Sequence, residues 1–438
     1  MLMVRIFGER AVHIHSSLDQ YTRRIGMLSR NAKLYLVATI LQGLGSGIWG
    51  VIFYLYLNLG EVGFNLDFIG NMFTASALAT GFVALPAGLI CERIGPKKAL
   101  LIGLMASFIN PVQILVLHPT SLLAASLVSG LVGTVSWVAM APFMAENSTP
   151  EERTYLFSLD WTLMIIMGVI GSILGGVMPD LFNGFLNLHT GTDGSAIGYR
   201  ISLTISTALT LLAILPISLM KERQRMQKHR MVDLLSLRNI RSPRTIVKFM
   251  VPTAIIGFGA GFIVPLFNVF FKKRFLATPE QIGIMSSLSN VTLGVGILAA
   301  PALSRKLGKA KSVALCEYLS MPFIMLTTLS PNLTMATGAY VARTALMNMA
   351  GPIGSTLQME LVTETERATT NGLMVMADNI PRAVTASVSG VMMTGADFTT
   401  PFLFTTVTYF LASSIYYIFF RNAEANRAKE NVNSKKVS

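Results

Sequence analysis

Apolar and polar positions alternate along this chain in long blocks rather than residue by residue. Twelve apolar blocks are long enough to cross the hydrocarbon core of a bilayer, which takes about 20 helical residues. Backbone amides in lipid must be satisfied within their own segment, and blocks this long and continuous exclude barrel strands. The pattern therefore predicts an all-α membrane protein whose transmembrane helices lie at 34–57, 68–90, 99–117, 121–144, 156–178, 200–220, 249–271, 280–301, 311–330, 333–356, 370–394 and 400–420.

The composition agrees with a membrane protein and excludes an ordinary soluble enzyme. Only 13% of the 438 residues are charged and 52% are hydrophobic, whereas soluble domains average about 25% charged residues. The sequence contains no Gly-x4-Gly-Lys-[Ser/Thr] phosphate-binding loop and no evident Ser/His/Asp site. We therefore expect no enzymatic activity, no cofactor and no metal site.

The net charge of +13 is distributed unevenly between the two sides of the predicted bundle. Cytoplasmic loops of membrane proteins carry an excess of Lys and Arg, and most basic residues here fall on the same side as the two termini. We therefore expect a multi-pass protein of the plasma (inner) membrane with both termini in the cytoplasm, and no nucleic-acid partner. The few basic residues predicted on the external side are Arg200, Lys272, Lys273 and Arg274.

The two halves of the chain repeat each other at an offset of 214 residues. A glycine triplet in the first predicted helix recurs in the seventh, and small residues at this spacing permit close helix approach. An acid and a base after the fourth helix recur after the tenth. The repeated positions are Gly43, Gly45 and Gly47 with Gly257, Gly259 and Gly261, and Glu146 and Arg153 with Glu360 and Arg367.

An even number of helices in each half gives parallel repeats, as in transporters whose halves are related by an axis along the membrane normal. The basic and apolar residues between the halves predict either a segment on the anionic inner leaflet or a solvated tether. The predicted regions are a cytoplasmic N-terminal segment (1–33), an N-terminal six-helix bundle (34–220), a cytoplasmic linker (221–248), a C-terminal six-helix bundle (249–420) and a cytoplasmic tail (421–438).

The loop between the second and third predicted helices reads Gly88-x3-Glu92-Arg93-x-Gly95-x-Lys97-Lys98. This run resembles the loop motif G-x3-D-R-x-G-x-[RK]-[RK] of the major facilitator superfamily, with Glu in place of Asp. The resemblance extends over residues 30–420 and implies a fold of two pseudosymmetric six-helix bundles. It also implies that the first, fourth, seventh and tenth helices line a central cavity.

The resemblance further implies a cytoplasmic gate. A carboxylate at a helix end can face the positive N-terminus of another helix, while a neighbouring arginine pairs with an acid. Such pairs would hold the cytoplasmic ends of the halves together while the carrier faces outward. The expected gate residues are Gly88, Glu92, Arg93, Gly95, Lys97, Lys98, Glu146 and Arg153, with Glu360 and Arg367 as the equivalent set in the second half.

Ionisable side chains within the predicted helices are candidate substrate or proton sites, because charge is costly in a bilayer. Arg343 lies about 15 Å into the tenth helix, where we expect it to face the cavity. Asp378 and Arg382 are four residues apart, so they share a helix face and can pair. Glu317 is expected to snorkel or pair at the basic end of the ninth helix, and Asp160 is similarly shallow. Polar or aromatic candidates for the cavity are Gln42, Ser46, Trp49, Trp137, Asn268 and Asn348.

These features predict a secondary active transporter that carries a small-molecule substrate across the lipid bilayer by alternating access, acting as a monomer. The family resemblance and the abundance of Met, 25 residues, favour proton-coupled efflux of drug-like or metabolite compounds, with Asp378 as the first candidate for the proton carrier. One alternative is an importer of an anionic nutrient or metabolite anchored by Arg343. Another is a receptor or assembly factor that uses a carrier fold without transporting a solute.

Overall fold

The structure, a computed structural model, describes residues 28–187, 195–221, 242–363, 366–395 and 397–422. The described residues form helices and no strands, which confirms the predicted fold class. Most of the predicted linker, residues 222–241, lies outside the described residues, as do the terminal segments 1–27 and 423–438.

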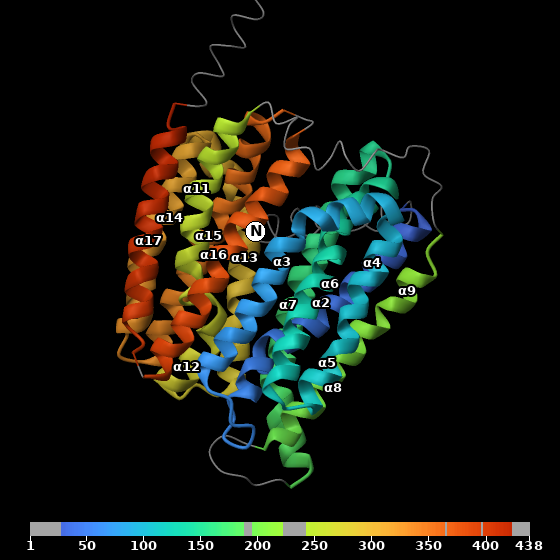
Figure 1. Cartoon of the computed structure of the whole chain (residues 1–438), viewed down its shortest axis with the longest axis vertical. Helices are drawn as coiled ribbons and strands as arrows, with labels where there is room; N and C mark the ends of the chain where they lie inside the picture. Colours follow the sequence, from blue (N-terminus) through green and yellow to red (C-terminus); the bar gives the residue numbers. More distant parts are fainter. Residues whose placement is uncertain (1–27, 188–194, 222–241, 364–365, 396, 423–438) are drawn as a thin grey trace, which may run out of the picture.

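The first six helical segments form the N-terminal bundle, on the right in Figure 1. Two of them are interrupted: the third changes to a 3-10 turn before Pro111, and the sixth breaks at Ala213 before Pro216, because proline lacks an N–H for the helical ladder. The segments are α2 (Arg30–Leu57), α3 (Leu66–Ile94), α4 (Pro96–Met105) with η1 (Ala106–Ile109) and α5 (Asn110–Leu115), α6 (Pro119–Glu146), α7 (Pro150–Phe185), and α8 (Ala196–Leu212) with α9 (Ile214–Ser218).

The last six segments form the C-terminal bundle. The seventh, predicted as one helix over 249–271, is broken after Gly261 by a 3-10 turn that contains Pro265. The segments are α11 (Pro243–Gly261) with η3 (Val264–Leu266) and α12 (Phe267–Phe275), α13 (Pro279–Leu307), α14 (Lys309–Leu329), α15 (Leu333–Leu361), α16 (Arg367–Thr394) and α17 (Thr400–Phe420).

All twelve predicted spans coincide with helical segments among the described residues. Ten of these segments are long and apolar enough to cross a membrane by length and composition alone. The other two, α15 and α16, are just as long but are not among these ten, and they carry Arg343 and the pair Asp378 and Arg382. The two segments that fall short of this criterion are therefore the ones that hold the predicted charged site.

The repeated glycines make equivalent contacts in the two bundles. A Cβ atom at Gly47 in α2 would lie 2.7 Å from the carbonyl oxygen of Gly168 in α7, and one at Gly261 in α11 would clash with the carbonyl of Arg382 in α16. The middle glycine of each triplet packs against a different helix: Gly45 lies against α8, and Gly259 lies against α17. The sequence repeat is thus also a repeat of helix packing.

The two motif loops end their helices in the same way. Gly95 after α3 has a φ of 89°, and Gly308 after α13 has a φ of 82°. Backbones with positive φ favour glycine, which has no Cβ. The turn therefore requires a glycine at this motif position in both halves, independently of any gating role of the neighbouring charged residues.

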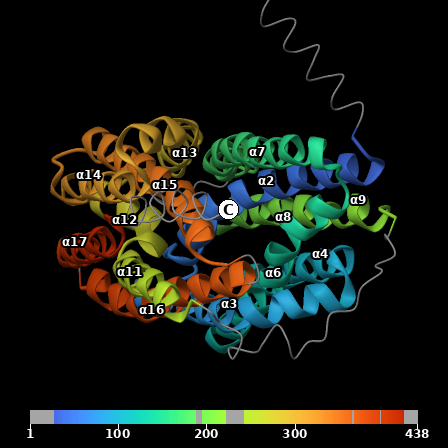
Figure 2. The same cartoon turned by 90° about the horizontal axis from the view of Figure 1, so that it is seen from above.

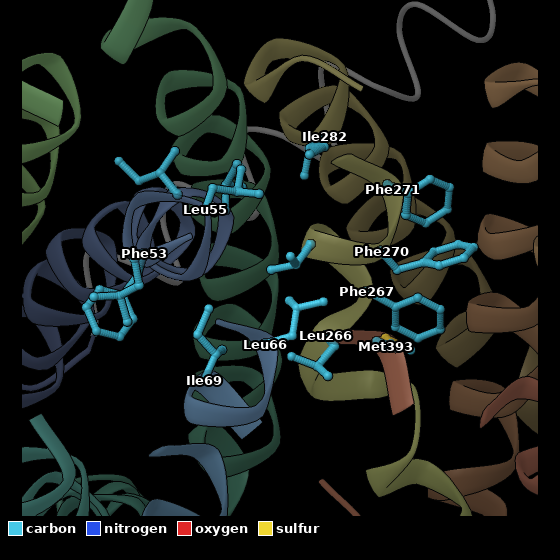
Figure 3. Close-up of a cluster of buried hydrophobic side chains, with 14 of the residues drawn as sticks. Phe53, Leu55, Leu66, Ile69, Leu266, Phe267, Phe270, Phe271, Ile282 and Met393 are labelled. Carbon is cyan, nitrogen blue, oxygen red and sulfur yellow. The ribbon is translucent and has the colours of Figure 1, made fainter. Parts of the chain in front are cut away.

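The hydrophobic core is continuous at one end of the molecule and divided at the other. We call the end that holds the start of α2 and the end of α17 the termini side, and the opposite end the far side. On the far side, one cluster joins residues from both bundles, including Phe53, Leu66 and Ile69 from the N-terminal bundle and Phe267 and Phe270 from the C-terminal bundle (Figure 3).

On the termini side the core is split into two clusters, one within each bundle. The N-terminal one contains Tyr35 and Phe143, and the C-terminal one contains Phe249 and Phe420. Figures 1 and 2 show the two groups of helices lying beside each other, with α3 and α16 adjacent. The bundles therefore share one hydrophobic core on the far side and have separate cores on the termini side, where α3 and α16 still touch at Leu85 and Gly372.

Polar contacts add to the far-side closure. Asn268 in α12 donates from Nδ2 to the carbonyl of Gly50 in α2 at 2.9 Å. Thr74 in α3 donates to the carbonyl of Ala383 in α16 at 2.6 Å. Such bonds are formed between helices of different bundles, so they must break if the far side opens.

Candidate functional site

A cavity of about 930 Å³ opens between the bundles on the termini side. This volume suits a small organic molecule. Its walls are the second half of α3, the second half of α6, the start of α7 and the first half of α16. The described lining residues that matter most for its chemistry are Ser76, Thr80, Gly88, Trp137, Met140, Asp160, Trp161, Thr369, Asn371 and Asn379.

The lining is mainly apolar, with two large aromatic side chains. Trp137 on α6 is 57% exposed, and Trp161 on α7 is 51% exposed. Of these two, sequence reasoning selected Trp137 and missed Trp161. Asp160, the residue before Trp161, is the only acidic or basic residue among the described lining residues.

Asp160 is buried, with 2% of its surface exposed. Its Oδ1 lies 2.7 Å from the Oγ1 of Thr39 in α2. The carboxylate is covered by neighbouring helices and has no basic partner among the described residues. The sequence showed an acid inside an apolar run near the cytoplasmic end of its helix, which gives its depth but not its burial.

Arg343 lies inside the C-terminal bundle and not in the wall of the cavity, which differs from the predicted orientation. The side chain is 7% exposed, and its Nη2 donates to the hydroxyl of Tyr409 in α17 at 3.0 Å. Its guanidinium carbon lies 5.6 Å from the ring centroid of Phe267 and 5.8 Å from that of Tyr409. These rings provide cation–π contacts that partly replace hydration.

Asp378 and Arg382 form the ion pair that their spacing predicted. Nη2 of Arg382 lies 2.7 Å from each carboxylate oxygen of Asp378, so one guanidinium nitrogen is shared by both oxygens. Neither residue belongs to the described lining of the cavity. Asp378 is therefore already neutralised by its own helix, and a role in carrying protons stays a prediction.

The predicted stripe on α2 contacts other parts of its own helix. Ser46 donates to the carbonyl of Gly43 at 3.2 Å, and Trp49 stacks on Phe53 with ring centroids 4.4 Å apart. Gln42 and Trp49 are partly buried and Ser46 is exposed, and none of the three belongs to the described cavity lining. Their role in binding stays a prediction.

The two predicted asparagines lie in different settings. Asn268 bridges the bundles on the far side, as described above. Asn348 is exposed on α15 and donates to the carbonyl of Thr344 at 2.8 Å. It shares an exposed polar face of α15 with Ser355 and Thr356. A polar face on a membrane helix is more consistent with water than with lipid.

The predicted gate residues are not gathered into one cluster among the described side chains. Lys97 donates from Nζ to the carbonyls of Ser218 at 3.0 Å and Met220 at 2.6 Å, so it caps the end of α9 within its own bundle. Glu360 pairs with Lys309 at 2.5 Å, also within one bundle. Arg93 and Lys98 are exposed, Glu146 is partly buried, Gly88 lines the cavity and Gly95 forms the turn.

The side chains of Glu92, Arg153 and Arg367 lie outside the described part of the chain. In the state that is open on the termini side, a cytoplasmic gate would have no intact contacts between the two bundles. Lys97 and Glu360 agree with this expectation, because each contacts a partner within its own bundle. The gating role itself stays a prediction.

The sequence matches the family model described as Major Facilitator Superfamily over residues 35–258 and 249–437. Among curated proteins, no sequence matches the chain. Among solved structures, the fold is similar to that of a bacterial homolog of the human lysosomal transporter Spinster, in an inward-facing and unoccupied conformation, with 15% identity, a TM-score of 0.72, and coverage of 90% of this chain and 97% of that chain.

The fold is also similar to that of the nucleoside transporter NupG, with 14% identity, a TM-score of 0.68, and coverage of 90% of this chain and 99% of that one. A D-xylose-proton symporter is similar with 14% identity, a TM-score of 0.68, and coverage of 88% and 96%. At these identities the structural likeness establishes the fold alone. Because the family match extends over nearly the whole chain, this multi-pass membrane protein belongs to the Major Facilitator Superfamily.

Proposed function

We propose that the chain is a proton-coupled secondary transporter that exports drug-like or metabolite compounds by alternating access. The main support for alternating access is the division of the hydrophobic core. One cluster joins the bundles on the far side, while two separate clusters and a cavity lie on the termini side. Two bundles closed at one end and open at the other form one of the two states that a rocker-switch carrier requires.

The distribution of charge supports an inward-facing assignment for this state. Lys272, Lys273 and Arg274 lie at the end of α12 on the far side, whereas the basic motif loops lie on the termini side. Excess Lys and Arg on one side favours a cytoplasmic location for that side. The cavity then opens to the cytoplasm, which is where an exporter collects its substrate.

The lining of the cavity supports an organic substrate with a substantial apolar body. Trp137, Trp161 and Met140 offer large, polarisable contact surfaces. The alternative substrate class, an anion held by Arg343, lacks such support because the guanidinium lies between Phe267 and Tyr409 inside the C-terminal bundle.

A flux assay in proteoliposomes with an imposed pH gradient tests the proposal. Protein reconstituted with a panel of apolar cations, neutral drugs and organic anions should move at least one solute against its own gradient, and the flux should reverse when the pH gradient is reversed. Asp378→Asn should be compared under the same conditions. Flux that ignores the pH gradient would remove the proton as coupling ion, and a protein that moves no solute while co-purifying a stable partner would contradict transport.

A further inference from the structure

The wall of the cavity carries one acidic side chain and no basic one among the described lining residues. That acid is Asp160, and its remaining neighbours in the wall are uncharged. A negative charge in a medium of low dielectric constant acts over a longer distance than in water. A cation in this cavity would therefore be stabilised, whereas an anion would meet no described positive group.

Aromatic side chains flank this acid. Trp161 follows Asp160 directly on α7, and Trp137 faces the same cavity from α6. Indole rings are the best cation–π partners among the side chains, and both rings are half exposed. Met140 and Phe157 add apolar surface to the same wall. The site therefore combines one carboxylate with faces for a large apolar body.

The contacts of Thr39 indicate how Asp160 is accommodated when the cavity is empty of a cation. The Oγ1 of Thr39 lies 2.7 Å from Oδ1 of Asp160 and 3.3 Å from the carbonyl oxygen of Tyr35. A hydroxyl has one hydrogen, so both contacts are full hydrogen bonds only if Asp160 is protonated and donates to Thr39. The phenol of Tyr35, also from α2, is the titratable group that faces Asp160, and no basic group faces it from the described parts of the helices packed against α7.

We propose that the cavity binds an amphiphilic organic cation, with Asp160 as the carboxylate that attracts its charge and Trp137 and Trp161 as the walls for its apolar body. This inference rests on the proposed function and specifies its substrate class. Binding replaces one positive charge by another: the O–H bond of the Asp160 acid breaks, the proton passes to water in the cavity, and the cation neutralises the carboxylate. One group that holds either a proton or a cation couples their movements in opposite directions.

Binding to the purified full-length protein in detergent provides the test. Tetraphenylphosphonium and tetraphenylborate have the same shape and opposite charge, so they separate electrostatic from apolar recognition. The chain has three tryptophans, two of which line the cavity, so fluorescence quenching reports occupancy, and calorimetry gives the affinity. The wild-type protein should bind tetraphenylphosphonium and not tetraphenylborate, and at mildly acidic pH it should release about one proton per bound cation.

Asp160→Asn should weaken cation binding by about tenfold or more and abolish proton release, while Asp160→Glu should retain both in part. Trp137→Ala should weaken binding without changing proton release. Glu317→Gln is the matched control, because Glu317 is also a buried acid in a membrane helix but is absent from the described cavity lining. If Asp160→Asn does not fold, the proposal is tested by proton release from the wild-type protein and by cation binding to the Asp160→Glu variant.

Two results would overturn the inference: cation affinity unchanged in Asp160→Asn, or equal affinity for tetraphenylborate. Failure of the proposed function looks different. In that case tetraphenylphosphonium would bind with dependence on Asp160, but no solute would cross proteoliposomes under either pH gradient. Conversely, gradient-driven flux of a neutral or anionic solute with no cation binding would remove the substrate class and leave transport intact.

Discussion

The guanidinium of Arg343 donates to the phenol oxygen of Tyr409 at 3.0 Å, and this contact ties α15 to α17 inside the C-terminal bundle. The Nε of Arg343 is buried without a described partner. A charge in this position is costly, and the rings of Phe267 and Tyr409 compensate for only part of the lost hydration. The bond to Tyr409 is therefore important for the stability of the bundle.

Tyr409→Phe should destabilise the protein without changing ligand affinity. The substitution keeps the ring and removes the acceptor, and loss of a hydrogen bond to a buried charged group costs about 1.5–3 kcal/mol. The midpoint of thermal unfolding in detergent should fall, while tetraphenylphosphonium should bind as in the wild type. Unchanged stability with impaired uptake of an organic anion would instead identify Arg343 as a substrate anchor.

Ser413→Ala should lower the stability of the protein more than Glu317→Gln does. The Oγ of Ser413 in α17 lies 2.7 Å from Oε2 of Glu317 in α14, and both side chains are buried. Removing the hydroxyl leaves a buried carboxyl group without this partner, at a cost of about 1–3 kcal/mol. Glutamine keeps the size and the hydrogen-bonding capacity of the acid, so its unfolding midpoint should stay close to the wild-type value. The reverse order of stabilities would show that the charge of Glu317 is required.

Asp397 should make the stability of the protein depend on pH in the acid range. The side-chain hydroxyl of Thr400 and the backbone N–H groups of Thr400 and Thr399, 3.0 and 3.1 Å from Oδ1, hold the pKa of the Asp397 carboxyl below its usual value. Because the folded-state pKa is lowered, the stabilisation is complete above the unfolded-state value of about 3.9 and is lost as the pH falls through the folded-state value.

Asp397→Asn should remove this part of the acid sensitivity. Unfolding midpoints of wild type and variant, measured from pH 6 down to about pH 3, should differ most at the upper end and converge at the lower end. Parallel curves over the whole range would mean that the cap at the start of α17 does not depend on the charge of Asp397.

The fold could be predicted because its determinants are visible in the linear sequence, either within one segment or as a repeat between the halves. Most spans are long apolar runs, and the offset of 214 residues predicted two equivalent halves, in which Gly47 and Gly261 make equivalent contacts. The pairing of Asp378 with Arg382 also follows from one helix alone. In each case the pattern can be read directly from the linear sequence.

The candidate site was harder to predict because it depends on how helices are rotated against each other. The position of Arg343 along its helix gives a depth, but the direction of its side chain is set by Phe267 and Tyr409 from two other segments. The burial of Asp160 could not be predicted for the same reason, since it comes from the packing of α2 against α7. Neither contact leaves a signal in the sequence near the residue itself.

Gly283→Ala should shift the protein toward the state that is open on the far side. Gly283 in α13 and Gly176 in α7 face each other across the two bundles, and a Cβ at Gly283 would lie 2.5 Å from the carbonyl oxygen of Ser172. Backbone atoms cannot move aside as a flexible side chain can, so the added methyl group must separate α7 from α13. The far-side closure is then weakened, whereas the termini side, where the bundles are already apart, gains nothing from the substitution.

Spin labels on cysteines introduced at Gly60 and Leu276, one exposed position in each bundle on the far side, measure this shift. The population with the longer distance should increase in Gly283→Ala. Gly338→Ala is the control, because a Cβ there meets no atom within 4 Å. If the far-side distance in Gly283→Ala equals that in the control, the glycine contact between α7 and α13 does not hold the bundles together. The closure would then depend on the hydrophobic cluster around Phe267 and Phe270 alone.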